Sequence, residues 1–104
     1  MEPRSMQQII NRKRYDTETS TLLSGDDFWD GRNWERRGRN IFLYRTRNGA
    51  YFAVHLTQRW QGEQDRIEPL SEDEAIAIFE SHLEAGEVRV EFEAAFPKVT
   101  VEDA

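Results

Sequence analysis

The chain has 104 residues, a formal net charge of −6, 38% hydrophobic residues and 12% aromatic residues. That length predicts a single domain over residues 1–104, and the aromatic content suffices for a folded core, which excludes a disordered tail. Cysteine is absent and no apolar run approaches the roughly 18 residues of a membrane helix, so disulfides, thiolate chemistry and membrane insertion are excluded and a cytoplasmic protein is expected.

Charge is unevenly distributed along the chain. Residues 1–61 hold 11 basic and 7 acidic residues, a net charge of +4, whereas residues 62–104 hold 3 basic and 13 acidic residues, a net charge of −10. Solvated faces on basic strands and acidic helices would account for this division. The alternative is that an acidic surface meets a basic partner, or that the basic part meets phosphate.

A flexible end is expected over residues 1–6, and the stretch QQIINRKRYDTETSTLL follows it. Its apolar residues and threonines predict a strand near residues 7–14 and a second extended piece near residues 17–23. The run of Arg12, Lys13 and Arg14 lies within the first strand and is too short to indicate a nucleic-acid patch. We therefore expect this region to add one or two strands to an antiparallel sheet.

A long aromatic loop is predicted over residues 24–40, SGDDFWDGRNWERRGRN, because glycines punctuate it throughout. Its rings could fold over the sheet, or they could contact a partner protein, since Trp and Arg side chains dominate interface energy. The residues that would make that contact are Phe28, Trp29, Trp34, Arg36 and Arg37. The loop has neither calcium-loop spacing nor a Gly-Lys-Ser/Thr phosphate motif, so no metal site and no cofactor are predicted.

A β-hairpin is predicted over residues 40–59, because Asn48-Gly49 favours a two-residue turn between two runs of strand-forming residues. The register that follows pairs Tyr44 with Ala53. Alternation then places Ile41, Leu43, Phe52, Val54 and Leu56 on one face, which is core. The other face carries Phe42, Tyr44, Thr46, Tyr51, Ala53, His55 and Thr57, and what covers it is an open question.

This second face combines aromatic rings with polar tips and could therefore be a working surface. Stacked nucleobases would suit it, but the chain has no RNP-type motif and its net charge repels nucleic acid, so a nucleic-acid partner is disfavoured. The best case for an enzyme is acid–base work by His55 beside Tyr44. Because no nucleophile elbow, metal pair or cofactor fingerprint accompanies them, we predict a structural histidine and a non-enzymatic protein.

A short strand is expected around Ile67, and LSEDEAIAIFESHLEAG then predicts a long helix. Ser71 is a suitable N-cap with Glu74 three residues later, as in a capping box, and Gly86 suits the C-terminal cap. His82 lies in the last turn without a second ligand at metal spacing. The apolar face is expected to comprise Ala75, Ile76, Phe79 and Leu83.

Residues 87–96 fit two patterns, since Val88, Val90 and Phe92 alternate as in a strand while Phe92, Ala95 and Phe96 fit a helical face. The Glu-Ala-Ala run favours a short helix that Pro97 ends, followed by a flexible tail over residues 98–104. The predicted fold is therefore α+β: an antiparallel sheet of three to four strands with one long and one short C-terminal helix packed on one face. An edge strand or the aromatic face could also form a homodimer.

The order RYDTET, LYRT, NGAYF, PLSEDEA and FEAAF resembles a group of small uncharacterised bacterial proteins, some of them associated with plasmids and phages. The likeness covers roughly residues 12–96, apart from the aromatic loop. It implies a helical ending at FEAAF and is compatible with an origin in a mobile element. The group carries no activity that could be transferred to this chain.

Two functional hypotheses follow, both with another protein as the partner. In the first, the chain is a protein-binding module that contacts its partner through the aromatic loop. In the second, the acidic helical half imitates nucleic-acid charge and blocks a basic cleft, as a phage-type anti-CRISPR or anti-restriction inhibitor would. The residues of this acidic alternative are Glu72, Asp73, Glu80, Glu84, Glu87 and Glu91.

Overall fold

The computed structural model describes residues 5–25, 40–56 and 65–102 of the chain. Within these residues six strands precede two helices. The strands are β1 (Gln7–Ile10), β2 (Lys13–Asp16), β3 (Thr21–Gly25), β4 (Asn40–Arg45), β5 (Tyr51–Leu56) and β6 (Arg66–Leu70), with a 3₁₀ turn at Thr17–Thr19. The helices are α1 (Glu72–Glu84) and α2 (Phe92–Ala95).

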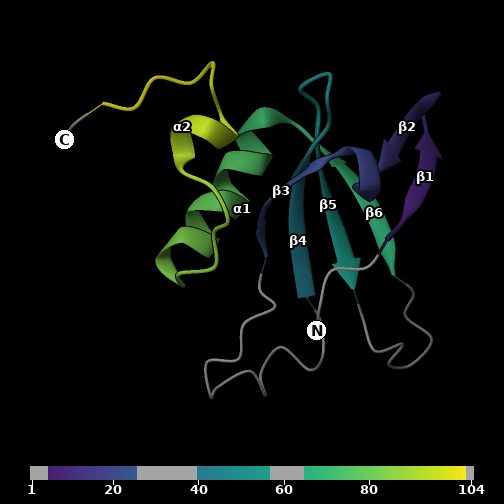
Figure 1. Cartoon of the computed structure of the whole chain (residues 1–104), viewed down its shortest axis with the longest axis horizontal. Coiled ribbons are helices and arrows are strands. Elements are labelled where there is room, and N and C mark those ends of the chain that lie inside the picture. Colours follow the sequence, from purple (N-terminus) through teal and green to yellow (C-terminus); the bar gives the residue numbers. More distant parts are fainter. Residues whose placement is uncertain (1–4, 26–39, 57–64, 103–104) are drawn as a thin grey trace.

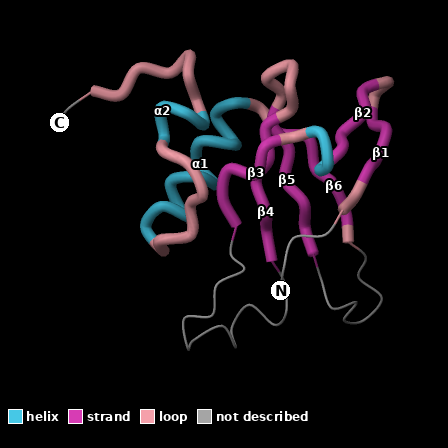
Figure 2. Tube along the Cα trace, in the orientation of Figure 1, coloured by secondary structure: helices cyan, strands magenta, loops and turns pink. Residues whose placement is uncertain are grey.

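The elements form three layers. Strands β3, β4, β5 and β6 make a four-stranded antiparallel sheet in that order, while β1 and β2 form a separate two-stranded sheet. The helices lie on one side of the larger sheet and the β1–β2 hairpin lies on the other (Figures 1 and 2). The α+β class and the antiparallel pairing are confirmed, but the expected single sheet is divided into two.

The N-terminal region forms a hairpin instead of the single strand predicted over residues 7–14. The chain reverses at Asn11 and Arg12, whose φ angles are 52° and 66°, and Ile10 pairs with Lys13 across them. Two successive positive φ angles are the signature of a type I′ turn, which usually contains glycine. The prediction failed because arginine at the second turn position is an unusual choice that gives no turn signal.

The β4–β5 hairpin forms where predicted, but its register is shifted by one residue. Tyr44 pairs with Phe52 instead of Ala53, because the turn contains three residues instead of two. Thr46 and Ala50 close it: the Thr46 amide donates to the Ala50 carbonyl at 2.8 Å, and the Thr46 hydroxyl accepts from the Ala50 amide at 3.0 Å. Gly49 has φ 86° whereas Asn48 has no positive φ, the pattern of a three-residue loop.

The one-residue shift places the β5 side chains on the opposite face, relative to those of β4, from the one predicted. Both faces of the resulting sheet are buried. One face carries Phe42, Tyr44, Phe52, Val54, Leu56 and Ile67, which pack with Tyr15 from the N-terminal hairpin. The Tyr15 ring meets that of Phe52 edge-on with centroids 5.5 Å apart, and Tyr44 stacks on Phe52 at 5.2 Å. The β1–β2 hairpin therefore covers Phe42 and Tyr44 of the face whose covering the sequence left open, while Tyr51 of that predicted face packs against the helices.

The 3₁₀ turn that follows β2 anchors the start of the hairpin. Asp16 caps the turn by accepting from the Glu18 amide at 2.9 Å. Buried Thr17 receives a hydrogen bond from the Met6 amide at 2.9 Å, and its own amide donates to the Met6 carbonyl at 3.0 Å. Ser5 and Met6, which were expected in a flexible end, are thus tied to the fold.

Helix α1 begins and ends with the predicted caps. The Ser71 hydroxyl accepts from the Glu74 amide at 3.1 Å, and the Glu74 carboxylate accepts from the Ser71 amide at 2.9 Å. These hydrogen bonds from Ser71, the backbone one first, lower the pKa of the Glu74 carboxyl below its ordinary value. At the other end, Gly86 at φ 73° and Glu87 donate to the carbonyls of Leu83 and His82, which forms a Schellman motif.

The second core lies between the sheet and the helices. Its buried members are Leu23, Leu43, Tyr51, Ala75, Phe79, Ala95 and Phe96. The predicted apolar face of α1 is wrong at its last position, because Leu83 is 51% exposed and His82 is buried in its place. Residues 75, 79 and 82 follow the i, i+4, i+7 line of a helix, so His82 lies on the side of α1 that faces the sheet.

Residues 87–99 combine the two patterns that the sequence allowed. Val88 forms an isolated bridge with Ser24, and the Arg89 amide donates to the Leu23 carbonyl at 2.8 Å, so this stretch covers the outer edge of β3. Phe92–Ala95 then forms the short helix α2, as predicted. The Tyr51 hydroxyl donates to the buried Ala95 carbonyl at 3.0 Å and fixes α2 on the sheet.

Candidate functional site

A strongly acidic surface is formed by the outward side of α1 together with the start of α2. Helix α1 buries Ala75, Phe79 and His82 toward the sheet and exposes its carboxylates. Its 13 residues include five carboxylates and neither lysine nor arginine. Glu74 and Glu93 are exposed there as well. We call the exposed residues of the predicted acidic set the acidic layer, and it comprises Glu72, Asp73, Glu80, Glu84 and Glu91.

Glu87 was predicted to belong to this surface, but it does not. The residue is 4% exposed, because the chain turns back toward β3 immediately after Gly86. The Glu87 carbonyl accepts a hydrogen bond from the Gly25 amide at 3.0 Å, which holds the residue against the edge of the sheet. A partner that meets the acidic layer would therefore not reach this carboxylate.

The five residues of the aromatic-loop hypothesis, Phe28, Trp29, Trp34, Arg36 and Arg37, lie outside the described residues. The predicted loop itself is shorter than 24–40, since Ser24 and Gly25 belong to β3 and Asn40 belongs to β4. Residues 26–39 thus connect two neighbouring antiparallel strands of the four-stranded sheet.

A buried hydroxyl–imidazole pair, which sequence reasoning missed, joins β3 to α1. The Ser24 Oγ and the His82 Nδ1 are 2.6 Å apart, and the two residues are 0% and 6% exposed. A β-bulge at Leu23 and Ser24 allows both residues to face the helices, whereas strict alternation would separate them. Because the hydroxyl has no exposed surface, this pair can fix the helix on the sheet but cannot meet a substrate in this conformation.

His55 is paired with Glu68 and not with Tyr44. Its Nε2 lies 2.8 Å from the Glu68 Oε1, and the two side chains are 20% and 42% exposed. The corrected register places His55 on the helix-facing side of the sheet and Tyr44 on the opposite side. The acid–base arrangement considered for an enzyme is therefore absent, and the observed pair is a cross-strand contact between β5 and β6.

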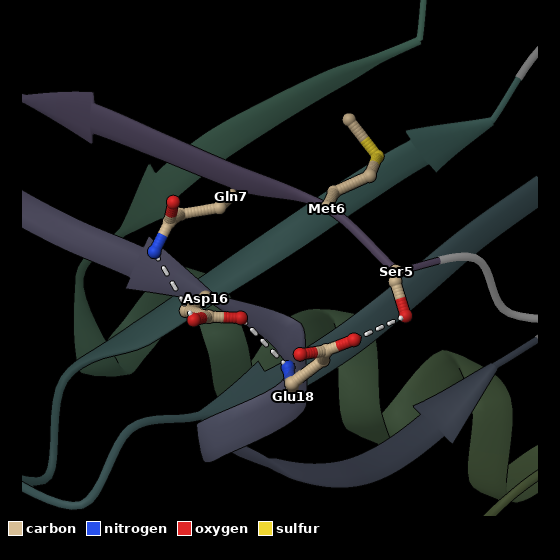
Figure 3. A pocket seen from close by; sticks show the side chains of 5 residues that line it. All are labelled: Ser5, Met6, Gln7, Asp16 and Glu18. Carbon is tan, nitrogen blue, oxygen red and sulfur yellow. Dashed lines mark hydrogen bonds between the residues drawn. The ribbon is translucent and has the colours of Figure 1, made fainter.

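An open hollow of about 230 Å³ lies where the N-terminal segment meets the 3₁₀ turn, lined by Ser5, Met6, Gln7, Asp16 and Glu18 (Figure 3). Its polar groups are satisfied by one another. The Ser5 hydroxyl donates to Glu18 at 3.1 Å, and the Gln7 amide donates to Asp16 at 3.2 Å. The hollow is smaller than a typical ligand pocket, and its contacts are explained by anchoring the hairpin.

Other kinds of site find no support in the part of the chain that the structure describes. No group of three or more His, Asp or Glu side chains there could hold a metal ion. No helix among those residues is long and apolar enough to cross a membrane. Comparison with known proteins finds no matching family model, no matching curated protein and no matching solved structure.

Proposed function

We propose that this chain is a non-enzymatic protein-binding module that contacts a basic partner surface through its acidic layer. The observation that carries the proposal is the absence of any lysine or arginine among the 13 residues of α1, beside five carboxylates. Three of these carboxylates have a role in the fold, since Glu72 and Asp73 suit the positive end of the helix and Glu74 completes the capping box.

Glu80 and Glu84 have no such role. They lie one helical turn apart on the exposed side of α1, and a like-charge pair at this spacing destabilises a helix by roughly 0.2–0.5 kcal/mol. A lysine at either position would instead stabilise the helix by a similar amount. Contact with positive charges on a partner explains why two carboxylates occupy these positions.

The more specific version of this proposal is a nucleic-acid charge mimic. A row of carboxylates on a rigid helix can occupy a cleft whose basic residues normally bind phosphate. An inhibitor of the anti-CRISPR or anti-restriction type would work in this way, and the resemblance to proteins of plasmids and phages supports that class. The acidic layer, without Glu87, would then be the contact surface.

The aromatic segment supports a second candidate surface for the same general function. It contains Trp29 and Trp34 together with Arg36 and Arg37 in a connection between neighbouring strands. Tryptophan and arginine are the residues most enriched among interface hot spots. In this version the contact is anchored by buried rings, and its affinity depends little on salt.

Affinity capture from a bacterial lysate at low and high salt distinguishes these surfaces. The test proteins Glu80→Lys and Glu84→Lys are each compared with Glu102→Lys, which changes the net charge equally outside the acidic layer. A Trp29→Ala/Trp34→Ala protein tests the aromatic segment. Each captured protein is then purified and titrated against the variants.

A partner that is lost at high salt and by the helix reversals, but kept by the control reversal, would support the acidic layer. A partner that is kept in salt and lost with the tryptophans would move the function to the aromatic segment. Equal loss in the helix and control reversals would show a general charge effect and refute the acidic layer as a defined surface. A basic cleft on the purified partner would support the charge mimic.

A further inference from the structure

The turn of the β1–β2 hairpin is built from residues that are unfavourable there. Arg12 has φ 66°, a left-handed conformation that glycine adopts freely and that side chains with a Cβ adopt at a cost in free energy. The preceding Asn11, at φ 52°, tolerates this conformation better. Asn-Gly would form the same turn without strain, so the geometry of the turn does not explain the arginine.

Register and burial show what surrounds this arginine. Ile9 pairs directly with Arg14, so the two side chains share the outer face of the hairpin, while Ile10 and Tyr15 point to the core. Ile9 is 63% exposed, one of three large apolar side chains in that state among the described residues. The outer face near the turn therefore carries the exposed Ile9 side chain beside the Arg14 guanidinium, and the exposed Arg12 follows in the adjoining turn.

The cations of the hairpin are exposed and lack partners within the part of the chain that the structure describes. No hydrogen bond or ion pair joins Arg12, Lys13 or Arg14 to another described side chain. The nearest carboxylates along the chain, Asp16 and Glu18, lie at the base of the hairpin, where they accept hydrogen bonds from Gln7, Ser5 and the turn amide and form no ion pair with these cations. The distal half of the hairpin therefore carries three cations that no carboxylate among the described residues pairs with.

This charge acts independently of the acidic layer. The hairpin lies on the opposite side of the sheet from α1 (Figures 1 and 2), in a molecule whose longest dimensions are 41 and 37 Å. At physiological ionic strength charges are screened over a distance of about 8 Å. A binding partner at the hairpin thus meets a local field that is positive, although the formal net charge of the chain is −6.

We propose that the distal hairpin, through Ile9 and Arg14 on its outer face and Arg12 in its turn, is a second docking surface, which binds an acidic segment of a partner protein. Charge complementarity favours an acidic ligand. The exposed isoleucine favours a protein over a nucleic acid, because phosphates and sugars make few apolar contacts with an aliphatic side chain. Arginine contacts carboxylates through two parallel hydrogen bonds, which favours it over lysine at this position. The module would then contact a basic surface on one side and an acidic segment on the other.

Fluorescence anisotropy with a labelled peptide of alternating glutamate and valine tests the ligand class. The intact protein is compared with Arg12→Gln/Lys13→Gln/Arg14→Gln, and with Arg47→Gln/Arg66→Gln/Lys98→Gln as a control that removes three exposed cations elsewhere. We expect the hairpin variant to bind the peptide at least tenfold more weakly and the control to bind it within twofold of the intact protein. Ile9→Ser should weaken binding several-fold without changing its dependence on salt.

Arg12→Gly separates a docking role from a role in folding. Glycine removes the turn strain together with the cation, so the thermal midpoint should stay the same or rise while peptide affinity falls. A lowered midpoint would show that Arg12 serves the fold, and unchanged affinity would overturn the docking surface. Two results would identify another ligand and overturn the proposal. Tighter binding of a DNA duplex of about 16 base pairs than of the peptide would identify nucleic acid as the ligand. Self-association in sedimentation experiments that depends on protein concentration and is lost in the hairpin variant would identify a second copy of this chain.

Discussion

Gly25 is the position at which a single methyl group should perturb the fold most selectively. The residue ends β3 directly opposite Phe42, whose ring is fully buried in the core under the N-terminal hairpin. A Cβ built on Gly25 would lie 2.8 Å from the Phe42 Cε1 and closer still to Cδ1. Real Cβ atoms do not approach a ring so closely, so either the strand or the ring has to move.

Two opposing terms set the size of the effect of Gly25→Ala. Overpacking a filled core costs about 1–3 kcal/mol, and replacing glycine by alanine returns roughly 0.4–1 kcal/mol by restricting the unfolded chain. We therefore expect the free energy of unfolding to fall by about 1.5 kcal/mol in urea titrations. The methyl group has no strain of its own to add, because Gly25 does not have a positive φ.

A double-mutant cycle with Phe42→Leu identifies the cause. If the methyl group meets the ring, the double variant should lose less stability than the sum of the single losses, by about 0.5 kcal/mol or more. Gly86→Ala is the control: it has φ 73° and no atom within 4 Å of the added Cβ, so its loss should be additive with Phe42→Leu. Additive behaviour of Gly25→Ala, or no loss at all, would refute the contact.

Three further predictions concern polar groups. Ser24→Ala should lower the free energy of unfolding by about 1–3 kcal/mol in urea titrations, because His82 loses a hydrogen bond in a buried site. A loss below about 0.5 kcal/mol, the size of an ordinary surface substitution, would contradict a stabilising Ser24–His82 hydrogen bond. Tyr51→Phe should cost about 1–2 kcal/mol and increase hydrogen exchange in α2, since the Ala95 carbonyl loses its donor. The lowered pKa of Glu74 contributes stability that is present above the unfolded pKa and lost as pH falls through the folded pKa. In urea titrations the stability advantage of the wild type over Glu74→Gln should therefore disappear in acid. An advantage that persists in acid would show that titration of the Glu74 carboxyl does not control the cap.

Local chemistry made the helix predictable. A capping box, an acidic first turn and a glycine after the last turn each act over a few residues, and the structure contains all of them at α1. The hairpin of β4 and β5 was predictable for the same reason, through Gly49 and the aromatic strands around it. What these signals could not fix was the register, because two-residue and three-residue turns both accept Asn-Gly. In the observed turn Arg47 belongs to the loop and Thr46 closes it with Ala50.

Burial that depends on distant segments was not predictable. Nothing near Tyr15 in the sequence indicates that it packs on Phe52, and nothing near Glu87 indicates that it lies against β3. His82 is a partial exception, because its position three residues after Phe79 places it on the apolar side of the helix. Because histidine is polar, the sequence favoured burial of Leu83 instead, and the bulge that gives His82 a buried partner has no sequence signature.

The sequence motifs RYDTET, LYRT, NGAYF and PLSEDEA have structural roles in this fold. In RYDTET, Tyr15 fills the core, Asp16 caps the 3₁₀ turn and Thr17 binds the start of the chain. In LYRT and NGAYF, Thr46 and Gly49 close a hairpin, and PLSEDEA begins a helix. Because these motifs are accounted for by folding, the activity has to be sought in the residues that folding does not explain.

Among the described residues, folding does not explain two charged sets, and these sets have opposite charge. Glu80 and Glu84 form a repulsive pair on one side of the sheet, and Arg12 occupies a strained turn position on the other. Each costs the isolated fold some stability that a common substitution would restore. Screening separates the two fields, since the molecule is several times wider than the distance of about 8 Å over which charges interact at physiological salt. A net charge of −6 therefore describes neither surface, and binding at one should be altered by salt and by charge reversal independently of binding at the other.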